Sequence, residues 1–448
     1  MDLAKRYNVI IIGSGFAGLS AAIEAKRKYN NVIVIDKLNT ASGNSIISDG
    51  GIGVAGSDLQ VSYGINDSPE HLVKDMLRAG QYQNDPDLVN LVAKHSNDAY
   101  EWTKNFGVKY QNRVDIFGGH SVQRCLTPMG KSGKDIIKVL YKNAVDEGVE
   151  FNFQTTVTKI IIKDNKTYKI ETQNKNKTIQ SYHVQDKLII ASGGFGSDYD
   201  LIKHYDPSLV HLKSTNLPTT KGDILTMMEQ NEAQLIDMQE IQCGPWGSPD
   251  EKGFGLGPLF VDYIVLSQGI LINPNTSKRF VNEKADRKIV SDAMIELNFA
   301  VALADSDMVK KSRWNLTKLL NKNIVKSFDS LNALAKAYDL DETILSNTIN
   351  TYNYKVMHQE TDEFHKDLSN LSTLSKAPFY TMKTVPKIHF TMGGLKINTR
   401  AQVIKKDGTP FDNIFAAGEC TGGIHGRSRL GSMSITDCIV VGRIAGAQ

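Results

Sequence analysis

The chain begins with two short apolar runs joined by a stretch of helical periodicity. Residues 9–12 (VIII) and 32–35 (VIVI) contain no polar side chain, which is typical of parallel strands that are buried on both faces. Between them, apolar residues recur at helical spacing over residues 19–26. This pattern predicts a strand–helix–strand unit at the start of the fold.

Two further apolar runs end in small residues. They are residues 187–197 (KLIIASGGFGS) and residues 412–423 (DNIFAAGECTGG). Small residues at the end of a strand allow a large ligand to lie against the backbone. Because the second run lies far along the chain, we expect sequence from both ends of the chain to complete one domain.

The middle of the chain has a different periodicity. Residues 57–149 are predicted to be helical, with an amphipathic pattern over 86–107, and residues 149–173 alternate as strands of β-hairpins. Composition changes over residues 241–386, where glycine and proline cluster first and a helical block follows over 291–354. The change in composition indicates a separate region.

Composition excludes several classes of protein. Lys and Arg total 52 against 49 Asp and Glu, and this near balance argues against a nucleic-acid-binding surface. The four cysteines, Cys125, Cys243, Cys420 and Cys438, show neither C-x-x-C nor C-x-x-C-H spacing, so we expect no metal site and no attached c-type haem. No apolar run approaches the length of a membrane span, and the short polar lead shows no signal peptide.

The turn after the first predicted strand carries a dinucleotide-binding pattern. Gly13, Gly15 and Gly18 have G-x-G-x-x-G spacing between that strand and the helix, and Asp36 follows the second strand. The pyrophosphate is expected at the helix N-terminus, where free N–H groups and the helix dipole favour negative charge. NAD and FAD both satisfy this pattern, and the small residues at the ends of the two later strands favour FAD.

A glycine-rich turn near the C-terminus carries two arginines. Within residues 423–434 (GIHGRSRLGSMS), Arg427 and Arg429 are separated by one residue, so on an extended turn they are expected to point the same way. Glycine lets the backbone approach a ligand closely, and arginine binds anions through a fixed fork of donors. The turn therefore predicts a bound anion.

These segments together resemble the flavoprotein family of fumarate reductase, succinate dehydrogenase and ketosteroid dehydrogenase. The matching segments are GSGFAG, SGNSIISDGGI, IIASGGF and AAGECTGGIHG, while TMGGLKI and GRSRLGSMSITD are most similar to the soluble flavocytochrome c fumarate reductase branch, which includes urocanate and related enoate reductases. The resemblance implies an α/β fold. A Rossmann-like FAD-binding domain with a parallel sheet and a β-meander would comprise residues 1–240 and 389–448, and an inserted α+β capping domain would comprise residues 241–388.

The resemblance also implies that FAD is bound non-covalently. Membrane-bound members attach FAD through a histidine in the segment that matches NSIISDGG, and this segment contains none. The residues that the resemblance places along the cofactor are Gly13, Ser14, Gly15, Ala17, Gly18, Asp36, Lys37, Ser42, Gly43, Asn44, Ser45, Gly50, Gly51, Val157, Ala191, Ser192, Gly193, Gly222, Asp223, Gly418, Glu419, Ser434 and Ile435.

Three basic residues are expected at the substrate. In the family, the arginine four residues after F-V-N-E, the histidine preceding T-M-G-G and the arginine before L-G converge on it, and here these are Arg287, His389 and Arg429. Without the resemblance, Arg287 would be interpreted as a surface ion-pair partner of Glu283 and Asp286, and His389 as a structural histidine.

These residue types suit the reduction of an alkene conjugated to a carboxylate. Hydride passes from flavin N5 to the β-carbon and a proton to the α-carbon, so negative charge accumulates on the carboxylate side, where fixed cations stabilise it. Arg429 would clamp the carboxylate, His389 would add a donor, and Arg287 would deliver the proton. Three acids are candidates for returning a proton to this arginine, with no order among them: Asp262, Glu283 and Asp286.

The sequence departs from fumarate reductases at the other end of the substrate. Those enzymes surround a second carboxylate with a histidine and a threonine from an H-P-T segment, whereas residues 242–253 here (QCGPWGSPDEKG) contain Trp246 and no histidine. Because indole offers an apolar face, we expect a monocarboxylic enoate such as urocanate, a cinnamate-like acid or methacrylate. His120, near Arg124, and Gly431 are further candidates for this pocket. A purely structural role would explain His120 and Trp246 as well.

Three other functions remain as alternatives to a monocarboxylic enoate reductase. A fumarate reductase proper would keep the mechanism, and a ketosteroid-type dehydrogenase would share the FAD fold but would use tyrosines to polarise a ketone. A non-catalytic flavin electron-transfer subunit would not need Arg287, His389 and Arg429. Since the chain has no haem attachment motif, electrons are expected from a separate donor: a cytochrome, an FMN-bearing protein or reduced flavin.

Overall fold

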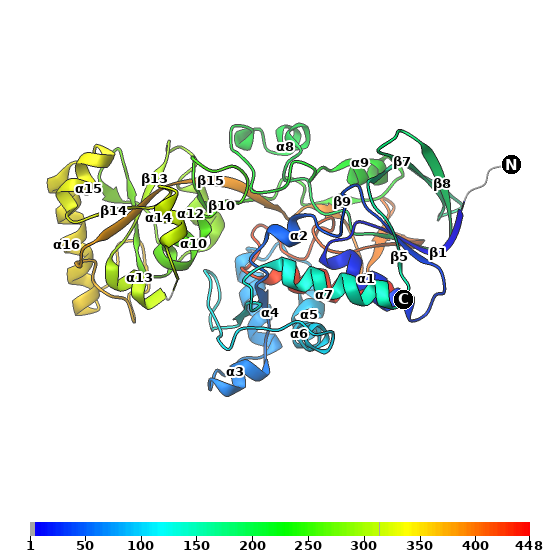
Figure 1. Ribbon diagram of the computed structural model, residues 1–448, viewed down its shortest axis with the longest axis horizontal. Helices are drawn as coiled ribbons and strands as arrows, with labels where there is room; N and C mark the ends of the chain where they lie inside the picture. Colours follow the sequence, from blue (N-terminus) through cyan, green and yellow to red (C-terminus); the bar gives the residue numbers. More distant parts are fainter. Residues whose placement is uncertain (1–4, 313) are drawn as a thin grey trace.

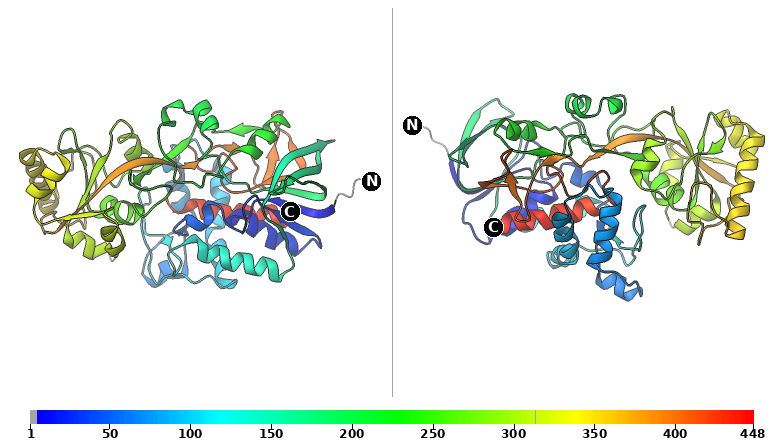
Figure 2. Two further views of the ribbon diagram at one scale, coloured as in Figure 1. Left: turned by 45° about the horizontal axis from the view of Figure 1, so that its top comes forward. Right: turned by 180° about the vertical axis from the view of Figure 1, so that it is seen from behind.

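The computed structural model describes residues 5–312 and 314–448 and has two lobes along its long axis (Figure 1). The larger lobe is built on an eight-stranded sheet and the smaller lobe on a six-stranded sheet. Each lobe has its own cluster of buried hydrophobic side chains. The chain before the first strand of the smaller sheet and the chain after its last strand both lie in the larger lobe (Figure 2).

The larger sheet confirms the predicted α/β fold. Its strands lie in the order β17 (Gln402–Ile404), β18 (Pro410–Ala416), β8 (Ile179–Ile190), β1 (Lys5–Ile12), β2 (Val32–Ile35) and β5 (Glu150–Asn152). Neighbours from β18 to β5 pair in parallel. An antiparallel meander of β6 (Thr155–Lys163) and β7 (Lys166–Asn174) continues from β8. Strand β18 pairs with β8 although more than 200 residues separate them in sequence, so both ends of the chain complete this sheet, as expected.

Helices α1 (Phe16–Lys26) and α17 (Met433–Ala447) pack directly against each other beside this sheet (Figure 2). A Cβ at Gly442 would lie 2.5 Å from the carbonyl oxygen of Ala17, and a Cβ at Gly446 would lie 2.3 Å from that of Ala21. The two backbones are therefore too close to admit any side chain at these positions. This contact joins the beginning and the end of the chain in the larger lobe.

The other elements of the larger lobe are shorter or peripheral. They are α2 (Asn44–Ile47), β3 (Ile52–Gly53), α3 (Asp58–Ser62), α4 (Pro69–Ala79), α5 (Pro86–Lys94), α6 (Ser96–Asn105), β4 (Cys125–Leu126), α7 (Gly133–Asp146), α8 (Tyr199–Tyr205), η1 (Pro207–Leu209), α9 (Asp223–Gln230), β9 (Leu235–Ile236) and β16 (Gly394–Leu395). The helical prediction for residues 57–149 is correct for α3 to α7. It is wrong for residues 106–132, which form a largely irregular loop that carries β4.

The smaller sheet is antiparallel, with strand order β10 (Ile241–Gly247), β15 (Phe379–Thr391), β13 (Ala300–Ala304), β11 (Ile270–Asn273) and β12 (Lys278–Arg279). Strand β14 (Lys326–Phe328) pairs with β15. Its helical segments are α10 (Pro258–Phe260), η2 (Val261–Val265), α11 (Leu266–Gln268), α12 (Arg287–Asp292), α13 (Ser306–Ser312), α14 (Thr317–Asn321), α15 (Leu331–Tyr338) and α16 (Glu342–His358). The helical prediction for residues 291–354 is wrong at β13, a fully buried strand in the middle of this sheet, and at β14.

Strand β15 connects the two lobes. It extends from the smaller lobe toward the larger one (Figure 1), pairing with β13 in its first half and with β10 in its second half. The predicted boundary at residue 388 falls inside this strand, and the division into three segments stays a prediction. In the described part of the chain, none of the helices has the length and hydrophobicity that crossing a membrane requires.

Candidate active site

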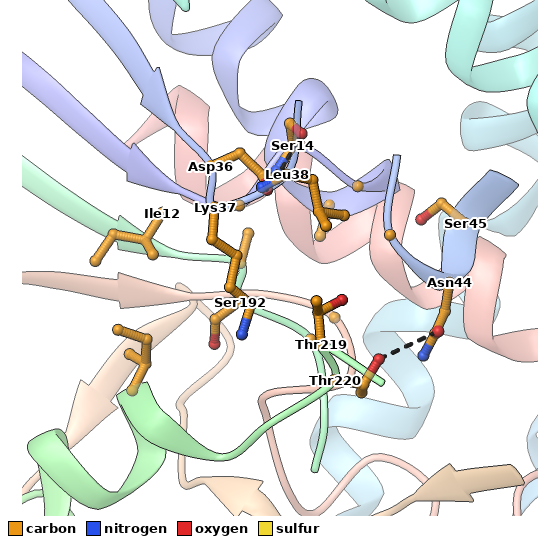
Figure 3. A pocket seen from close by; sticks show the side chains of 18 of the residues that line it. Ile12, Ser14, Asp36, Lys37, Leu38, Asn44, Ser45, Ser192, Thr219 and Thr220 are labelled. Atoms are coloured by element: carbon orange, nitrogen blue, oxygen red, sulfur yellow. Dashed lines mark hydrogen bonds between the residues drawn. The ribbon is translucent and has the colours of Figure 1, made fainter. Parts of the chain in front are cut away.

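A cavity lies at the C-terminal ends of β1 and β2 in the larger lobe (Figure 3). Its walls come from residues 12–17, 35–38, 42–45, 155–157, 191–193, 219–221, 223–224 and 417–419, together with Cys438. Figure 3 shows these segments around one space, with the Thr220 hydroxyl donating a 3.2 Å hydrogen bond to the Asn44 side chain. The turn between β1 and α1 therefore faces an elongated space that several distant segments enclose.

Glycine is required at two points of this turn. Gly13 has φ +103°, and a Cβ there would lie 2.2 Å from the carbonyl oxygen of Ala191 at the end of β8. A Cβ at Gly18 would lie 1.9 Å from the carbonyl oxygen of Gly13. Gly18 thus lets α1 pack closely on the end of β1, while Gly13 and Gly15 line the cavity.

The carboxylate of Asp36 is fixed where β2 ends. It accepts hydrogen bonds from the backbone N–H of Ser14 at 2.8 Å, from the Ser14 hydroxyl at 2.6 Å and from the backbone N–H of Leu38 at 2.8 Å. All three residues line the cavity. An acid held in this position after the second strand is suited to accept a hydrogen bond from a ribose hydroxyl.

The structure places most of the predicted cofactor residues around this cavity. Those that line it are Gly13, Ser14, Gly15, Ala17, Asp36, Lys37, Ser42, Gly43, Asn44, Ser45, Val157, Ala191, Ser192, Gly193, Asp223, Gly418 and Glu419. Gly51, Ser434 and Ile435 line a second cavity instead. Gly18, Gly50 and Gly222 line neither cavity, and Gly222 is the residue before α9.

Five polar residues of the wall were not predicted: Thr155, Thr156, Thr219, Thr220 and Lys221. Thr155 and Thr156 begin strand β6, and the other three lie in the loop before α9. The two groups are far apart in sequence, so only the tertiary fold brings them to the cavity. No local signal in the sequence could have identified them.

The second cavity adjoins the first and reaches the junction of the two lobes. The two cavities share Phe16, Asn44, Ser45, Glu419 and Cys438. The three basic residues predicted at the substrate, Arg287, His389 and Arg429, all line the second cavity. Trp246, Phe254, Phe390, Asp49 and Asp262 line it as well.

Arg429 is a buried guanidinium without a carboxylate partner among the described residues. The residue is 4% exposed, its Nη1 donates to the Leu430 carbonyl at 3.2 Å, and its Nε has no hydrogen-bond partner among the described residues. The guanidinium carbon lies 4.7 Å from the ring centre of Phe390. Burial and the charge of Arg287 lower the pKa of Arg429 to about 10, so it remains a cation at neutral pH.

The sequence predicted that the two arginines of the glycine-rich turn point the same way, and this prediction is wrong. Arg427 is exposed and lies 3.6 Å from Glu240 at the surface, whereas Arg429 points into the cavity. The backbone turns at Arg427 and bends at Ser428, and the buried hydroxyl of Ser428 is hydrogen-bonded to the side chains of Asp286 and Gln242. The turn thus offers one arginine, not two, to an anion in this cavity.

Arg287 begins helix α12 and pairs with an acid from the segment η2. Its Nη2 lies 3.1 Å from Oδ2 of Asp262, and its guanidinium carbon lies 4.5 Å from the ring centre of Trp246. Its Nε has no hydrogen-bond partner in the described chain. Burial raises the pKa of Asp262, and the charge of Arg287 opposes that shift. The cation is therefore held between a carboxylate and an aromatic face.

The alternative interpretation of Arg287, as a surface ion-pair partner of Glu283 and Asp286, is not what the described residues show. Glu283 is buried and pairs with Arg279 at 2.8 Å and with Lys366 at 3.0 Å. Asp286 caps the N-terminus of α12 and accepts a hydrogen bond from Ser428. Of the three candidate acids, only Asp262 contacts Arg287 directly.

His389 lies on β15 at the boundary between the lobes. Its Nδ1 is 2.9 Å from the hydroxyl of Thr215, and its ring centre lies 5.2 Å from that of Trp246, edge to face. Burial, followed by the charges of Arg429 and Arg287, holds the pKa of His389 well below its usual range. The imidazole is therefore neutral at physiological pH and can donate one N–H into the cavity when Nδ1 accepts from Thr215.

Trp246 is buried, with 1% of its surface exposed, and its Nε1 has no partner among the described residues. Its position depends on Gly244, because a Cβ there would lie 2.5 Å from the indole carbon Cζ2. The ring packs against both Arg287 and His389. Trp246 therefore supports two of the basic residues and also forms an apolar wall of the cavity.

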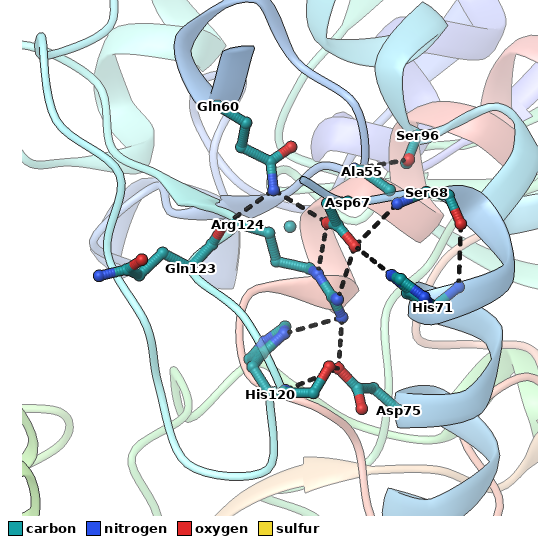
Figure 4. Close-up of polar contacts among 12 residues, drawn as sticks. Ala55, Gln60, Asp67, Ser68, His71, Asp75, Ser96, His120, Gln123 and Arg124 are labelled. Atoms are coloured by element: carbon teal, nitrogen blue, oxygen red, sulfur yellow. Dashed lines mark hydrogen bonds and ion pairs between the residues drawn. The ribbon is translucent and has the colours of Figure 1, made fainter. Parts of the chain in front are cut away.

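His120 lies beside Arg124 (Figure 4) and does not line the cavity. Its Nε2 is 2.8 Å from the carbonyl oxygen of Gly431, and its Nδ1 is 3.5 Å from Nη1 of Arg124. A carbonyl only accepts and a guanidinium only donates, so the ring carries its proton on Nε2. Burial and the charge of Arg124 lower the pKa of His120 to about 3, which keeps the ring neutral.

Arg124 is held in turn by two acids. It is fully buried and makes ion pairs with Asp67 at 2.9 Å and with Asp75 at 2.6 Å (Figure 4). Gly431, to which His120 bonds, is a close neighbour of Arg287, since a Cβ there would lie 3.6 Å from Arg287 Nη2. His120 and Gly431 therefore lie close to Arg287, and neither is part of the cavity wall.

Sequence comparisons agree with this arrangement. A family described as an FAD binding domain matches residues 8–435. The chain is 34% identical over 447 residues to a fumarate reductase (cytochrome) of Shewanella frigidimarina, covering 98% of this chain and 76% of the relative. It is 35% identical over 462 residues to the acrylate reductase flavoprotein subunit of Shewanella woodyi (98% and 90%), and 33% identical over 460 residues to a urocanate reductase of Eggerthella lenta (100% and 75%).

Structural comparisons give the same relationship. The open conformation of a flavocytochrome c3 fumarate reductase superposes with a TM-score of 0.80 at 30% identity, covering 99% of this chain and 78% of the other. A 3-ketosteroid-Δ4-(5α)-dehydrogenase from Rhodococcus jostii reaches a TM-score of 0.81 at 20% identity, which is a similarity of fold alone. The protein is an FAD-dependent oxidoreductase acting on carbon–carbon bonds, and it belongs to the flavocytochrome fumarate reductase and urocanate reductase family of enoate reductases.

Proposed function

We propose that this protein reduces the double bond of a monocarboxylic enoate with an apolar or aromatic substituent, such as urocanate, a cinnamate-like acid or methacrylate. The observation that carries the proposal is the convergence of Arg287, His389 and Arg429 on one cavity that has Trp246 and Phe254 in its wall. The relatives named above include reductases of fumarate, acrylate and urocanate, so the comparisons support an enoate and leave its identity to be tested.

The residues have separate tasks in this proposal. Arg429 binds the substrate carboxylate through its guanidinium fork, and the neutral His389 donates a further hydrogen bond to it. Both interactions strengthen as negative charge accumulates on that carboxylate. Arg429 is buried and His389 is partly buried, so the stabilisation is larger than it would be in water. FAD, when bound, supplies the hydride that adds to the β-carbon.

Arg287 delivers the proton to the α-carbon. Guanidinium is an unusual acid because its pKa lies far above neutrality, so proton transfer depends on the developing charge of the substrate and on rapid return of a proton. Asp262 is the favoured source of that proton among the three candidate acids, because it alone contacts Arg287 and because burial raises its pKa. Glu283 and Asp286 are engaged elsewhere.

The cofactor would occupy the first cavity and extend into the second. Its pyrophosphate would lie at the N-terminus of α1, and its flavin ring would lie near Gly51, Ser434 and Ile435, which line the second cavity. We propose non-covalent attachment, since residues 44–51 contain no histidine. A separate protein, either a cytochrome or an FMN-bearing protein, or free reduced flavin would supply the electrons.

The deciding experiment follows the flavin anaerobically. The purified holoenzyme is reduced with dithionite or a reduced viologen, and flavin reoxidation is recorded after adding urocanate, cinnamate, methacrylate, acrylate or fumarate. The proposal expects rapid reoxidation by one or more monocarboxylates and slow reoxidation by fumarate. Rapid turnover of fumarate alone would identify a fumarate reductase proper. If no enoate reoxidises the flavin, the enoate reductase assignment is wrong and 3-ketosteroids should be tested next.

A further inference from the structure

One acid of the second cavity has no task in the proposed reaction. Asp49 follows α2 in the larger lobe, and its carboxylate lines the cavity together with Asp262, Arg287 and Arg429. Its Oδ1 accepts a hydrogen bond from the backbone N–H of Gly51 at 3.0 Å. Its Oδ2 accepts one from the hydroxyl of Tyr263, which lies in the smaller lobe next to Asp262.

The hydroxyl that binds Asp49 is itself fixed. The ring of Tyr263 packs edge to face on Phe117, with ring centres 5.4 Å apart, and lies 4.3 Å from the ring centre of Trp314. Burial and the charge of Asp49 raise the pKa of Tyr263 well above its usual range, so the hydroxyl keeps its proton and donates it. Asp49 is therefore anchored from both lobes beside the catalytic residues.

The charges around the cavity leave one cation available. Arg287 is paired with Asp262, while Arg429 has no carboxylate partner among the described residues. His389 is neutral, since burial and the two arginines lower its pKa. The cavity therefore offers one free cation for one carboxylate group.

A second carboxylate on the substrate would meet unfavourable surroundings. The donors nearest to Asp49, the N–H of Gly51 and the hydroxyl of Tyr263, already donate to its carboxylate. The wall of this cavity also includes Asp262, the aromatic side chains of Trp246 and Phe254, and neutral hydroxyl and amide groups, those of Ser48, Thr215, Asn216, Ser432 and Ser434 among them. Like charges in a space with little water repel each other strongly, so neutral donors offset only part of the free energy that a second carboxylate would lose beside Asp49 and Asp262.

We infer that Asp49 is a specificity-determining residue, which excludes dicarboxylates from the site and so makes the protein selective for monocarboxylic enoates. The inference rests on the proposed function and deepens it, because it names the group that discriminates between the two substrate classes. It assigns the discrimination to a repulsive charge and not only to the lack of a histidine near Trp246.

The test compares two ligands of nearly equal shape that differ by one charge. Fumarate and monomethyl fumarate serve as substrates, and succinate and monomethyl succinate serve as unreactive ligands whose binding to the oxidised holoenzyme is followed by the change in flavin absorbance. Asp49→Asn and Asp49→Ser remove the charge, and Asp49→Glu is the matched control that keeps it. FAD content is measured for each variant, and a variant that lacks FAD is replaced by the other neutral one.

The wild-type protein is expected to prefer the monoester in kcat/KM and in binding. Both neutral variants should lower the ratio of monoester to dicarboxylate, in kcat/KM and in affinity, by about tenfold, chiefly through tighter binding of succinate. Asp49→Glu should keep the wild-type ratio. An unchanged preference in Asp49→Asn and Asp49→Ser would overturn the inference. If the wild-type protein reduces no enoate, the proposed function fails, and the binding comparison with succinate still decides the role of Asp49.

Discussion

At the scale of single residues, Arg429 is the side chain whose surroundings most clearly anticipate a ligand. Burying a guanidinium without a carboxylate partner costs free energy, and the shift of its pKa to about 10 reflects that cost. The contact with Phe390 and the hydrogen bond to Leu430 compensate it only in part. An anion that enters the cavity would restore the missing interaction, which is why this residue is expected to dominate substrate affinity.

Replacing Arg429 with lysine should therefore reduce kcat/KM for the preferred enoate by roughly 30-fold or more. Lysine keeps the charge but cannot form two parallel hydrogen bonds to a carboxylate, and the loss of one partner of a buried pair typically costs at least 2 kcal/mol. Steady-state kinetics normalised to FAD content would measure this effect. The matched control is Arg427→Lys, two residues away and exposed, which should leave kcat/KM within about twofold of wild type.

At the scale of secondary-structure elements, the irregular loop over residues 106–132 supports the turn that carries Arg429. His120 of this loop donates to the carbonyl of Gly431, and Arg124, Asp67 and Asp75 fix the orientation of His120. The loop has almost no regular backbone pairing, so buried side-chain interactions define its position. Such a loop can position a site as firmly as a strand does when every polar group is satisfied.

Substituting His120 with phenylalanine should lower both stability and activity. The carbonyl of Gly431 would lose its donor in a buried place, which typically costs about 1–3 kcal/mol, and the turn bearing Arg429 would be less well fixed. Urea unfolding and kcat/KM would report the two losses. Glutamine at the same position offers an N–H at similar reach and should recover part of kcat/KM. If it recovers stability without activity, His120 does not position the turn.

The sequence predicted the elements of the larger lobe better than those of the smaller one. The apolar runs of β1, β2, β8 and β18 are short, continuous and bounded by small residues, so the sequence could predict them as buried strands. Strand β13 has the same apolar character but lies among helices, and an isolated apolar run does not distinguish a buried strand from a buried helix. The loop over residues 106–132 has no hydrophobic periodicity, so the sequence could not predict the hydrogen bond between His120 and Gly431.

The site itself could be predicted only through the resemblance to known enzymes. Arg287, His389 and Arg429 come from α12, β15 and an irregular turn, and no local pattern links the three. The pairing of Arg287 with Asp262 and the opposite directions of Arg427 and Arg429 depend on tertiary packing. The position of Asp49 in the cavity also required the structure, because its partner Tyr263 lies more than 200 residues away in sequence.

At the scale of the whole molecule, one partly buried acid should make stability depend on pH. Glu419 lines both cavities and accepts hydrogen bonds from the backbone N–H and hydroxyl of Thr391 at 3.1 and 3.3 Å. Burial raises its pKa from 4.5 to about 7. A group whose pKa is raised by folding stabilises the folded state below its unfolded pKa, and that contribution is lost as the pH rises toward the folded pKa.

Glu419→Gln should therefore gain stability relative to wild type between about pH 4.5 and pH 7, with little further gain at higher pH. One pKa unit corresponds to about 1.4 kcal/mol, so the relative gain should reach at most about 3 kcal/mol. Urea unfolding of the FAD-free protein at pH 5, 6, 7 and 8 would measure it. A difference between variant and wild type that does not change with pH would show that Glu419 is ionised throughout this range.

The distribution of the two arginines between the lobes has a consequence for how a ligand connects them. Arg287 belongs to the smaller lobe and Arg429 to the larger one, and the charge of Arg287 contributes to lowering the pKa of Arg429. Asp262 offsets the charge of Arg287, while Arg429 has no carboxylate partner among the described residues. A carboxylate bound between the two guanidinium groups would be attracted by a charge from each lobe and would link the lobes through the ligand. A neutral amide of the same enoate would provide no comparable electrostatic link.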